Sequence, residues 1–519
     1  MEKSTPFVTP AVAMNPIAAV AGRSPNPWPR KRSGGSPPRS RSLVLCATSL
    51  LAVLAFFYFS YACVSTSLLR GSLEAAPRPS RRCEPRVRAL GQKFLSYAPH
   101  SGFSNQLSEF KNAIVVAAIL NRTLVVPPVL DHHAVALGSC PKFRVLGGRE
   151  IRLAVWESAV ELLRTGRYVS MADIIDISSL VSSSVIRTID FRVFTSIWCG
   201  VNIDLACDNG ATSESPLLAS LKQCGSFLSG FNGNVDECLY SVDEDCRSTV
   251  WTYQNGHDGE LDSFQPDEQL KRKKKITYVR RRRDVYNALG PGSQADSAAL
   301  LAFGSLFTSA YKGSQLYFDI HEAPKDPRIQ SIIEKIEFIP FVPQILSAGK
   351  EFALTTIKSP FLCAQLRLLD GQFKNHRETT FLALKEKVES LRQNGPLPIH
   401  IFVMTDLPEG NWSRTYLGDL AGDVDNFKLH FLQDEDELVI QTAKELAVAG
   451  HGLRIGFVAN RFTRMDKLKK LCSPRKLTDV LLYIEEVICS CASLGFVGTA
   501  GSTIAESIVT MRKHGVCSS

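Results

Sequence analysis

Three polar groups in the second half of the chain stand directly after apolar segments that we predict to be strands. Arg367 closes "CAQLR", Asp406 closes "IFVMTD", and Thr499–Thr503, "TAGST", follows "GFVG". In open α/β sheets, ligands bind outside the carboxyl ends of the strands. We therefore expect the three groups to lie at one edge of a sheet and to face one ligand.

A fourth group lies in the first half, where "HSGFSNQLSEF" (residues 100–110) precedes an apolar helical run. The start of a helix offers unpaired backbone N–H groups and the positive end of a dipole. The helix starts near Asn105 and Ser502 could therefore each bind a phosphate. Gly498 and Gly501 would let the backbone approach such a ligand closely.

Each group has a use in binding a nucleotide sugar. Arg367 could bind a diphosphate through two parallel hydrogen bonds and stabilise the charge of a leaving group. Asp406 could accept hydrogen bonds from the edge of a guanine base. Because an arginine and helix starts would meet the negative charge, we expect no metal. The second-half groups also have ordinary explanations. Arg367 could be a surface arginine, Asp406 a turn cap, and the segment Thr499–Thr503 a helix N-cap. Their joint placement favours the binding site.

The elements around the first-half group form an α/β unit. "KFLSYAP" predicts a strand, the apolar positions 107, 110, 114 and 117 predict a helix, and "TLVVPPV" predicts a second strand. Such units build parallel sheets. From about residue 137 to 327 the pattern weakens and cysteines cluster, which predicts insertions.

The second half repeats the α/β alternation more clearly. We predict strands at "FLCAQLRL", "IHIFVMTD", "LRIGFVAN" and "LGFVGT", and helices at "FLALKEKVESLRQNG", "DVLLYIEEVICS" and "IAESIVTMR". The fold class is therefore α/β, with two domains facing a cleft. We place the N-terminal domain at residues 91–325 and the C-terminal, ligand-binding domain at residues 326–519.

The first 90 residues differ in composition from the rest. Leu43–Val64 holds no charged residue and is long enough to span a bilayer as a helix, with more basic residues before it than after it. Residues 1–42 are rich in Pro, Ser, Gly and Arg, which predicts a disordered cytosolic tail, and residues 65–90 predict a stem. These segments indicate a single-pass type II membrane protein, which we place in the Golgi with the remainder in the lumen.

Charge and cysteine usage agree with that topology. The net charge of +9 comes from the tail (+6) and the stem (+4), so the folded part is near neutral and gives no reason to expect a nucleic-acid partner. Most of the 14 cysteines follow the apolar segment, as an oxidising lumen allows. "CSC" (Cys489 and Cys491) lacks the spacing of a zinc site, so we expect disulfides or buried thiols. The connectivity is left open.

Four segments then resemble, in order, the motifs of the GDP-fucose protein O-fucosyltransferase superfamily. "GFSNQLSEFKNAIVVAAILNRTLVVPPV" is similar to its first motif and "AQLRLLDG" to its second, while "FVMTD" and "FVGTAGSTIAE" resemble later ones. The resemblance runs from about residue 93 to 510. It implies a metal-independent, inverting glycosyltransferase of the GT-B type, with two Rossmann-like domains that hold GDP-fucose between them.

The resemblance also assigns roles by position. Asn105 would face the donor phosphates and sugar, Arg367 would bind the pyrophosphate and assist departure of the leaving group, and Asp406 would recognise the base. Ser502 and Thr503 would bind the phosphates. The remaining donor-site candidates are Gly102, Gln106, Asp370 and Gly501.

The sequence departs from the family pattern at several positions. Gln365 stands where the second motif usually has His, and Ile504 stands where many members have an aromatic residue. Some relatives carry a catalytic Glu in the first loop, whereas this chain has His100 nearby. An inverting transfer needs a group that takes the proton of the acceptor hydroxyl. The candidates are His100, Asp370 or, in a dissociative route, the leaving phosphate.

Two alternatives to fucose transfer stay open at this stage. One is a rhamnosyltransferase that uses UDP-rhamnose, and the other is a non-catalytic relative that binds a nucleotide sugar or a glycan. The acceptor is expected to be a protein or glycan hydroxyl.

Overall fold

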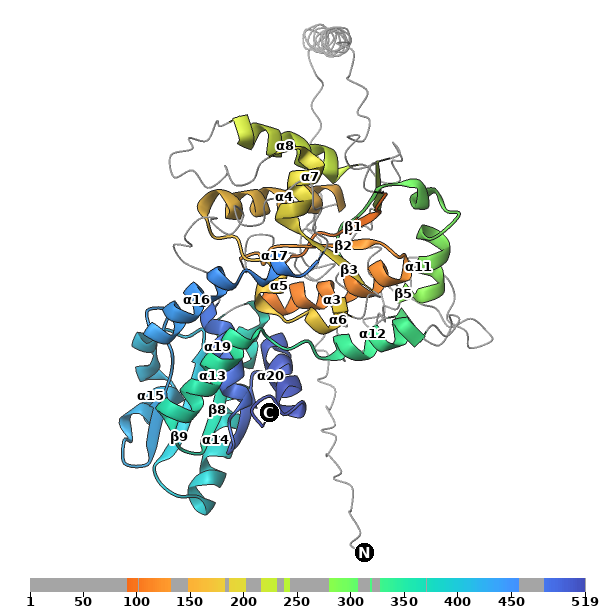
Figure 1. Ribbon diagram of the computed structural model, residues 1–519. Coiled ribbons are helices and arrows are strands. Elements are labelled where there is room, and N and C mark those ends of the chain that lie inside the picture. Colours follow the sequence, from red (N-terminus) through yellow and green to blue (C-terminus); the bar gives the residue numbers. More distant parts are fainter. Residues whose placement is uncertain are drawn as a thin grey trace, which may run out of the picture. The chain divides into compact units, whose positions relative to one another are not determined.

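The described part of the fold contains two main parallel β-sheets, each covered by helices, and a smaller two-stranded parallel pair (Figure 1). The computed structural model describes residues 91–100, 102–131, 148–182, 186–201, 216–230, 238–242, 280–306, 318–319, 327–369, 371–456 and 480–518. All of them belong to one compact unit, Arg81–Ser519. The predicted tail, apolar segment and stem lie outside the described residues, and no helix within those residues is long and apolar enough to cross a bilayer.

The first sheet has five strands in the order β3-β2-β1-β6-β4, and every neighbouring pair is parallel. Its strands are β1 (Phe94–Ser96), β2 (Thr123–Val126), β3 (Arg187–Asp190), β4 (Leu239–Val242) and β6 (Leu300–Phe303). Helix α3 (Phe103–Ile119) connects β1 to β2, which confirms the α/β unit predicted there. Strands β3, β4 and β6 were not predicted. They are only four residues long, and β6 is buried along its whole length, so it carries no alternating pattern.

Helices cover both faces of this sheet (Figure 1). Helices α4, α7 and α8 pack on one face around Trp156 and Phe194, and α3, α5 and α12 pack on the other. Elements of this half are α4 (Gly148–Thr165), α5 (Met171–Ile174), α6 (Ser178–Ser182), α7 (Phe191–Cys199), α8 (Pro216–Ser229), α11 (Arg282–Leu289), the short 3-10 helix Gln294–Ser297 and the strand pair β5 (Arg280–Arg281) and β7 (Phe318–Asp319). Helix α12 (Pro327–Glu337) follows them.

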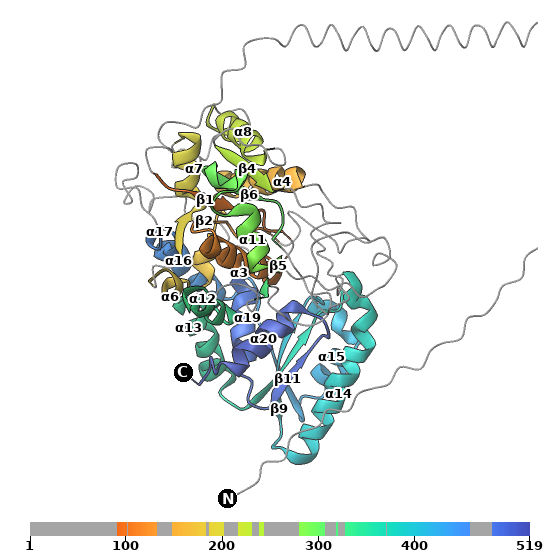
Figure 2. The same cartoon turned by 90° about the vertical axis from the view of Figure 1, so that its right-hand side faces the viewer.

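The second sheet has four parallel strands in the order β10-β9-β8-β11. They are β8 (Phe361–Leu366), β9 (Ile399–Thr405), β10 (Phe427–His430) and β11 (Gly495–Gly498). Alternate residues of β8 enter different core clusters: Leu362 and Ala364 pack with the helices α14 (Arg377–Asn394) and α15 (Tyr416–Gly422), while Phe361 and Cys363 face the opposite layer. Figure 2 shows α14 and α15 beside one face of this sheet.

Among the described residues, the opposite layer consists of five helical segments. They are α13 (Pro343–Glu351), the π-helix Phe352–Ile357, α16 (Glu437–Ala449), α19 (Val480–Ser490) and α20 (Thr503–Lys513). Among the second-half predictions, three strands (β8, β9 and β11) and three helices (α14, α19 and α20) are confirmed.

The strand predicted at "LRIGFVAN" was wrong at its start. Leu453 and Arg454 end a short helix, α17 (His451–Arg454), and residues 457–460 lie outside the described residues. The reason is tertiary: Leu453 is buried in the core of the first half, and the helix is held there by a backbone hydrogen bond from Gly452. Strand β10 was missed, although Phe427–His430 alternates apolar and polar residues as a half-buried strand does, because the run is only four residues long.

Three disulfides join described residues. Cys199–Cys224 links α7 to α8, Cys363–Cys489 links β8 to α19, and Cys491–Cys517 links the segment after α19 to the end of the chain. The expectation that the cysteines of "CSC" form disulfides is confirmed. Because these residues lie on different elements, their pairing was not predictable from spacing.

Candidate functional site

The three polar groups of the second half lie together at the carboxyl edge of the second sheet. Strand β8 lies between β9 and β11, and the register pairs Leu366 with Thr405 and Gln365 with Gly498. The residues that follow these strands, Arg367, Asp406 and Thr499, are therefore neighbours in space. The structure thus gathers them as the sequence analysis expected.

Hydrogen bonds fix the turn that carries Arg367 from both sides. The backbone N–H of Arg367 donates to Thr499 Oγ1 (2.9 Å). The next two N–H groups, of Leu368 and Leu369, donate to the two carboxylate oxygens of Asp406 (2.7 and 3.0 Å). Asp406 is exposed, and each of its oxygens keeps one acceptor position after these bonds.

The guanidinium of Arg367 lies over an aromatic ring. Its central carbon is 5.0 Å from the centroid of Phe373, which belongs to the 3-10 helix Gly371–His376. A cation above a ring is stabilised by the ring quadrupole, and the stacking restricts the orientation of the guanidinium plane. Asp370, the other candidate in this loop, lies outside the described residues.

The start of α20 forms the third side of the group. Gly501 has φ +74°, a left-handed conformation that favours glycine, and Ser502 is the N-cap. The Ser502 hydroxyl is fully buried, and no described residue forms a hydrogen bond with it. Leaving a buried hydroxyl unsatisfied costs about 1–3 kcal/mol, a cost that a hydrogen bond to a ligand would remove. Thr503 is exposed in the first turn.

Gln365, which replaces the family's usual His, supports this turn. It is buried, and both its backbone oxygen (3.0 Å) and its side-chain oxygen (3.3 Å) accept from the N–H of Thr499. The substituted residue therefore holds β8 to the segment after β11.

In the first half, Gly102 and Asn105 lie at the start of α3, beyond the carboxyl end of β1. Gly102 is the N-cap, and its carbonyl accepts from the N–H groups of Asn105 (3.0 Å) and Gln106 (3.1 Å). Asn105 is half-buried, and its side-chain amide has no hydrogen bond within the described part of the chain. That amide is therefore available to a ligand.

Gln106 and His100 point into the interior. The Gln106 amide bonds both backbone groups of Leu130, after β2 (2.8 and 2.9 Å). His100 Nε2 lies 2.8 Å from Ser305 Oγ and 3.1 Å from Glu109 Oε1. Burial lowers the pKa of His100 to about 3, so the ring is neutral at neutral pH.

Glu109 is a buried residue of this site that the sequence analysis missed. Its side chain is fully enclosed. Burial raises its pKa well above the usual range, although hydrogen bonds from the backbone N–H groups of His100 and Leu306 oppose the rise. We therefore treat Glu109 and His100 as a neutral hydrogen-bonded pair rather than as an ion pair. Local sequence gave little signal for it, because α3 also carries the polar residues Asn105, Gln106 and Asn112.

The two halves meet where α3 begins. The Phe103 ring, in the first residue of α3, lies 4.5 Å from the Tyr483 ring of α19, and α3 also contacts α20. Figure 2 shows these three helices together. The two helices predicted to bind phosphate are thus in contact.

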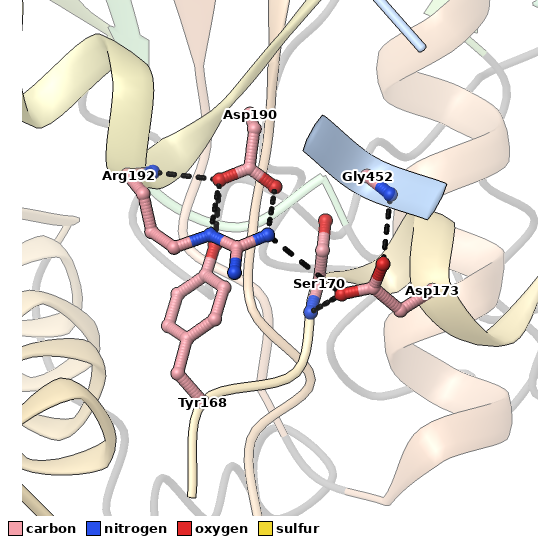
Figure 3. A network of polar contacts seen from close by, with 6 residues as sticks. All are labelled: Tyr168, Ser170, Asp173, Asp190, Arg192 and Gly452. Atoms are coloured by element: carbon pink, nitrogen blue, oxygen red, sulfur yellow. Dashed lines mark hydrogen bonds and ion pairs between the residues drawn. The ribbon is translucent and has the colours of Figure 1, made fainter. Parts of the chain in front are cut away.

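A buried ionic network also joins the halves (Figure 3). The Arg192 guanidinium donates to both oxygens of Asp190 (2.7 and 3.1 Å) and lies 3.8 Å from Asp173. Asp173 also accepts from the backbone N–H of Gly452 in α17 (2.7 Å). The network therefore attaches a helix of the second half to the first.

A groove of about 670 Å³ lies elsewhere, between the π-helix and the start of α16. Phe352, His430 and Asp436 contribute to its lining, and none of the predicted site residues does. Its carboxylates and apolar floor are unlike a diphosphate site, so we do not assign the donor to it.

The described residues define an α/β protein with an arginine and a helix start at its strand ends. No family model matches the chain. The chain is 57% identical to O-fucosyltransferase 30 of Arabidopsis thaliana, over 98% of this chain and 100% of that protein. It therefore belongs to the O-fucosyltransferase family and is a glycosyltransferase.

Solved structures of POFUT1 are also similar to the chain. The complex with GDP-fucose is 13% identical with a TM-score of 0.35, covering 81% of this chain and 94% of that one. A complex with GDP is 12% identical with a TM-score of 0.36 and the same coverage.

Proposed function

We propose that the chain transfers fucose from GDP-fucose to a hydroxyl of a protein or glycan, with inversion at the sugar carbon. The two α/β halves would face a cleft in the GT-B manner. The observation that carries the proposal is the grouping of Arg367, Asp406 and Ser502 at one sheet edge, in a chain 57% identical to an O-fucosyltransferase.

The diphosphate is assigned to the start of α20. The buried Ser502 hydroxyl would donate to a phosphate oxygen, and the N–H groups of the first turn would add the positive end of the helix dipole. Arg367, oriented by Phe373, would bind the diphosphate and stabilise the negative charge that develops as it leaves. Thr503, exposed in the same turn, is a further phosphate ligand.

Base recognition is assigned to Asp406. The edge of guanine offers two neighbouring N–H donors, at N1 and N2, which match the two acceptor positions left on the Asp406 carboxylate. Uracil offers one N–H between two carbonyl groups and cannot satisfy both positions. This arrangement favours GDP over UDP.

The transfer breaks the bond between the fucose C1 and the β-phosphate oxygen, and it forms a bond between C1 and the acceptor oxygen. Asn105 would face the sugar and phosphates. His100 is buried, and its ring is already in contact with Ser305 and Glu109. We therefore propose that the leaving phosphate takes the proton of the acceptor hydroxyl. The products are then the fucosylated acceptor and GDP.

We expect the transfer to be independent of a divalent metal, because Arg367 and a helix start supply the positive charge at the phosphates. Turnover in the presence of EDTA tests this expectation directly. Loss of activity that returns with Mn²⁺ or Mg²⁺ would contradict it.

The proposed compartment is the Golgi lumen, with the chain anchored by Leu43–Val64. The disulfides between described residues fit an oxidising compartment. Protection of the C-terminal part from protease in sealed membrane vesicles would support this topology, whereas digestion without detergent would contradict it.

The function is tested by GDP release from GDP-fucose, measured on the full-length chain in detergent. We expect release by the wild type and a loss of about 100-fold or more in Arg367→Ala, the range for removing a group that stabilises transition-state charge. Equal release by both would contradict the role of Arg367. Tight binding of UDP without GDP binding would favour a rhamnose donor, and GDP binding without turnover would favour a non-catalytic relative.

A further inference from the structure

Helix α3 carries a stripe of three buried polar side chains, Gln106, Glu109 and Asn112. Each is at most 5% exposed, and their spacing of three residues places them on one face of the helix. They lie among the apolar residues of the same helix, including Phe110 and Ile114, which form the core.

Together the three side chains hold segments that follow three strands of the first sheet, β1, β2 and β6. Gln106 bonds Leu130, after β2. Asn112 donates to the carbonyl of Leu306, after β6 (2.8 Å). The carboxyl edge of the first sheet is therefore tied to one helix face.

Glu109 stands at the centre of the stripe and joins two of these segments. Its Oε1 accepts from the backbone N–H of His100 (3.2 Å) and lies 3.1 Å from the His100 ring. Its Oε2 accepts from the backbone N–H of Leu306 (3.4 Å). His100 in turn contacts Ser305, so the ends of the neighbouring strands β1 and β6 share one buried carboxyl.

A fully buried carboxyl is unfavourable unless its hydrogen bonds compensate for the lost water. Here the compensating donors belong to the segments that follow β1 and β6, so the carboxyl is satisfied only while those segments keep their places. The structure of the loop and the burial of Glu109 are thus mutually dependent.

We propose that Glu109 is a positioning residue for sugar transfer, which fixes the loop of His100 and Gly102 so that Asn105 faces the donor. This inference rests on the proposed function and deepens it. Glu109 itself would not contact the donor, because it is enclosed beneath the loop. Its effect would appear in donor binding and in the mobility of the loop.

The test compares Glu109→Ala with Glu109→Gln in the full-length chain. Glutamine is neutral and nearly the same size, and its oxygen can still accept from the His100 N–H. We expect Glu109→Ala to raise the KM for GDP-fucose about tenfold, as the loss of a buried hydrogen-bond partner predicts. Glu109→Gln should stay within about threefold of the wild type. Glu109→Asp, which shortens the side chain by one methylene, replaces the alanine variant if that variant does not fold.

Two further measurements separate positioning from general instability. Leu384→Ala opens a cavity in the core of α14, a cluster that includes no residue of α3, and it should lower stability while leaving the KM unchanged. Amide hydrogen exchange should accelerate at His100 and at residues 102–106 in Glu109→Ala but not in Leu384→Ala.

An unchanged KM together with unchanged exchange in Glu109→Ala would overturn the inference. An equal rise of the KM in Leu384→Ala would also overturn it, because instability alone would then explain the effect. If the wild type releases no GDP from GDP-fucose, the proposed function fails, whereas the exchange comparison still decides whether Glu109 fixes the loop.

Discussion

Replacing Arg192 with methionine should strongly destabilise the chain, because it removes the only cation of the buried network among the described residues (Figure 3). The side chains of Arg192, Asp190 and Asp173 are 9%, 1% and 8% exposed. The substitution preserves much of the packing but removes two hydrogen bonds to Asp190 and the ion pair to Asp173. Breaking a buried ion pair in this way costs about 3–5 kcal/mol of unfolding free energy.

The loss should depend on pH with a defined sign. Burial already raises the pKa of Asp173, while Arg192 opposes the rise. Without the guanidinium, the pKa of this carboxyl in the folded state rises further above its unfolded value. The destabilisation is therefore full above the folded-state pKa, and it diminishes as pH falls through that pKa because a neutral carboxyl needs no cation.

Urea unfolding of the full-length chain, followed by circular dichroism at several pH values, measures both effects. Arg164→Met is the matched control, since Arg164 also pairs with a carboxylate, that of Glu161, but at the surface. That variant should show no resolvable change. A loss below about 1 kcal/mol in Arg192→Met, or a loss independent of pH, would refute this account of the network.

Three other substitutions test separate parts of the structure. Gly452→Ala would place a Cβ 2.7 Å from Ser170 Cβ and 2.8 Å from Asp190 Oδ2, so it should lower the unfolding free energy measured in urea. Gly410→Ala, which has open space around the new Cβ, should not lower it. Equal stability of the two variants would contradict the tight packing of α17. Ser502→Ala removes a buried unpaired hydroxyl, so it should raise the unfolding free energy of the unliganded chain by about 1 kcal/mol. The same variant should bind GDP more weakly in calorimetry. An unchanged GDP affinity would show that Ser502 is not part of the phosphate site. Asp406→Asn should weaken GDP binding about tenfold, through loss of charged hydrogen bonds, and leave UDP binding unchanged. An equal loss of affinity for GDP and UDP would show that Asp406 only supports the turn of Arg367.

Residues whose environment is set by nearby sequence were the predictable part of the structure. Strands β8, β9 and β11 are apolar segments that end at a polar residue, so both the strands and the positions of Arg367, Asp406 and Thr499 followed from the pattern. The N-cap position of Ser502 followed in the same way, from a small polar segment before an apolar helix.

Contacts between distant residues were the unpredictable part. Glu109 and Leu306 are 197 positions apart, and Gly452 and Asp173 are 279 positions apart. No local periodicity reports such pairs, so the polar stripe of α3 was missed and the last two residues of α17 were predicted as the start of a strand. Gln365 was noted as a departure from the family, while its bonds to Thr499 depend on the pairing of β8 with β11.

The central claim is that one GDP-fucose molecule is bound by residues from both halves of the chain. The most direct measurement is a crystal structure of the chain with GDP-fucose. It should show the phosphates within hydrogen-bond distance of the Arg367 guanidinium and the Ser502 hydroxyl, with the Asn105 amide facing the sugar. A donor bound away from Arg367 and Ser502, or contacting residues of one half alone, would contradict the claim.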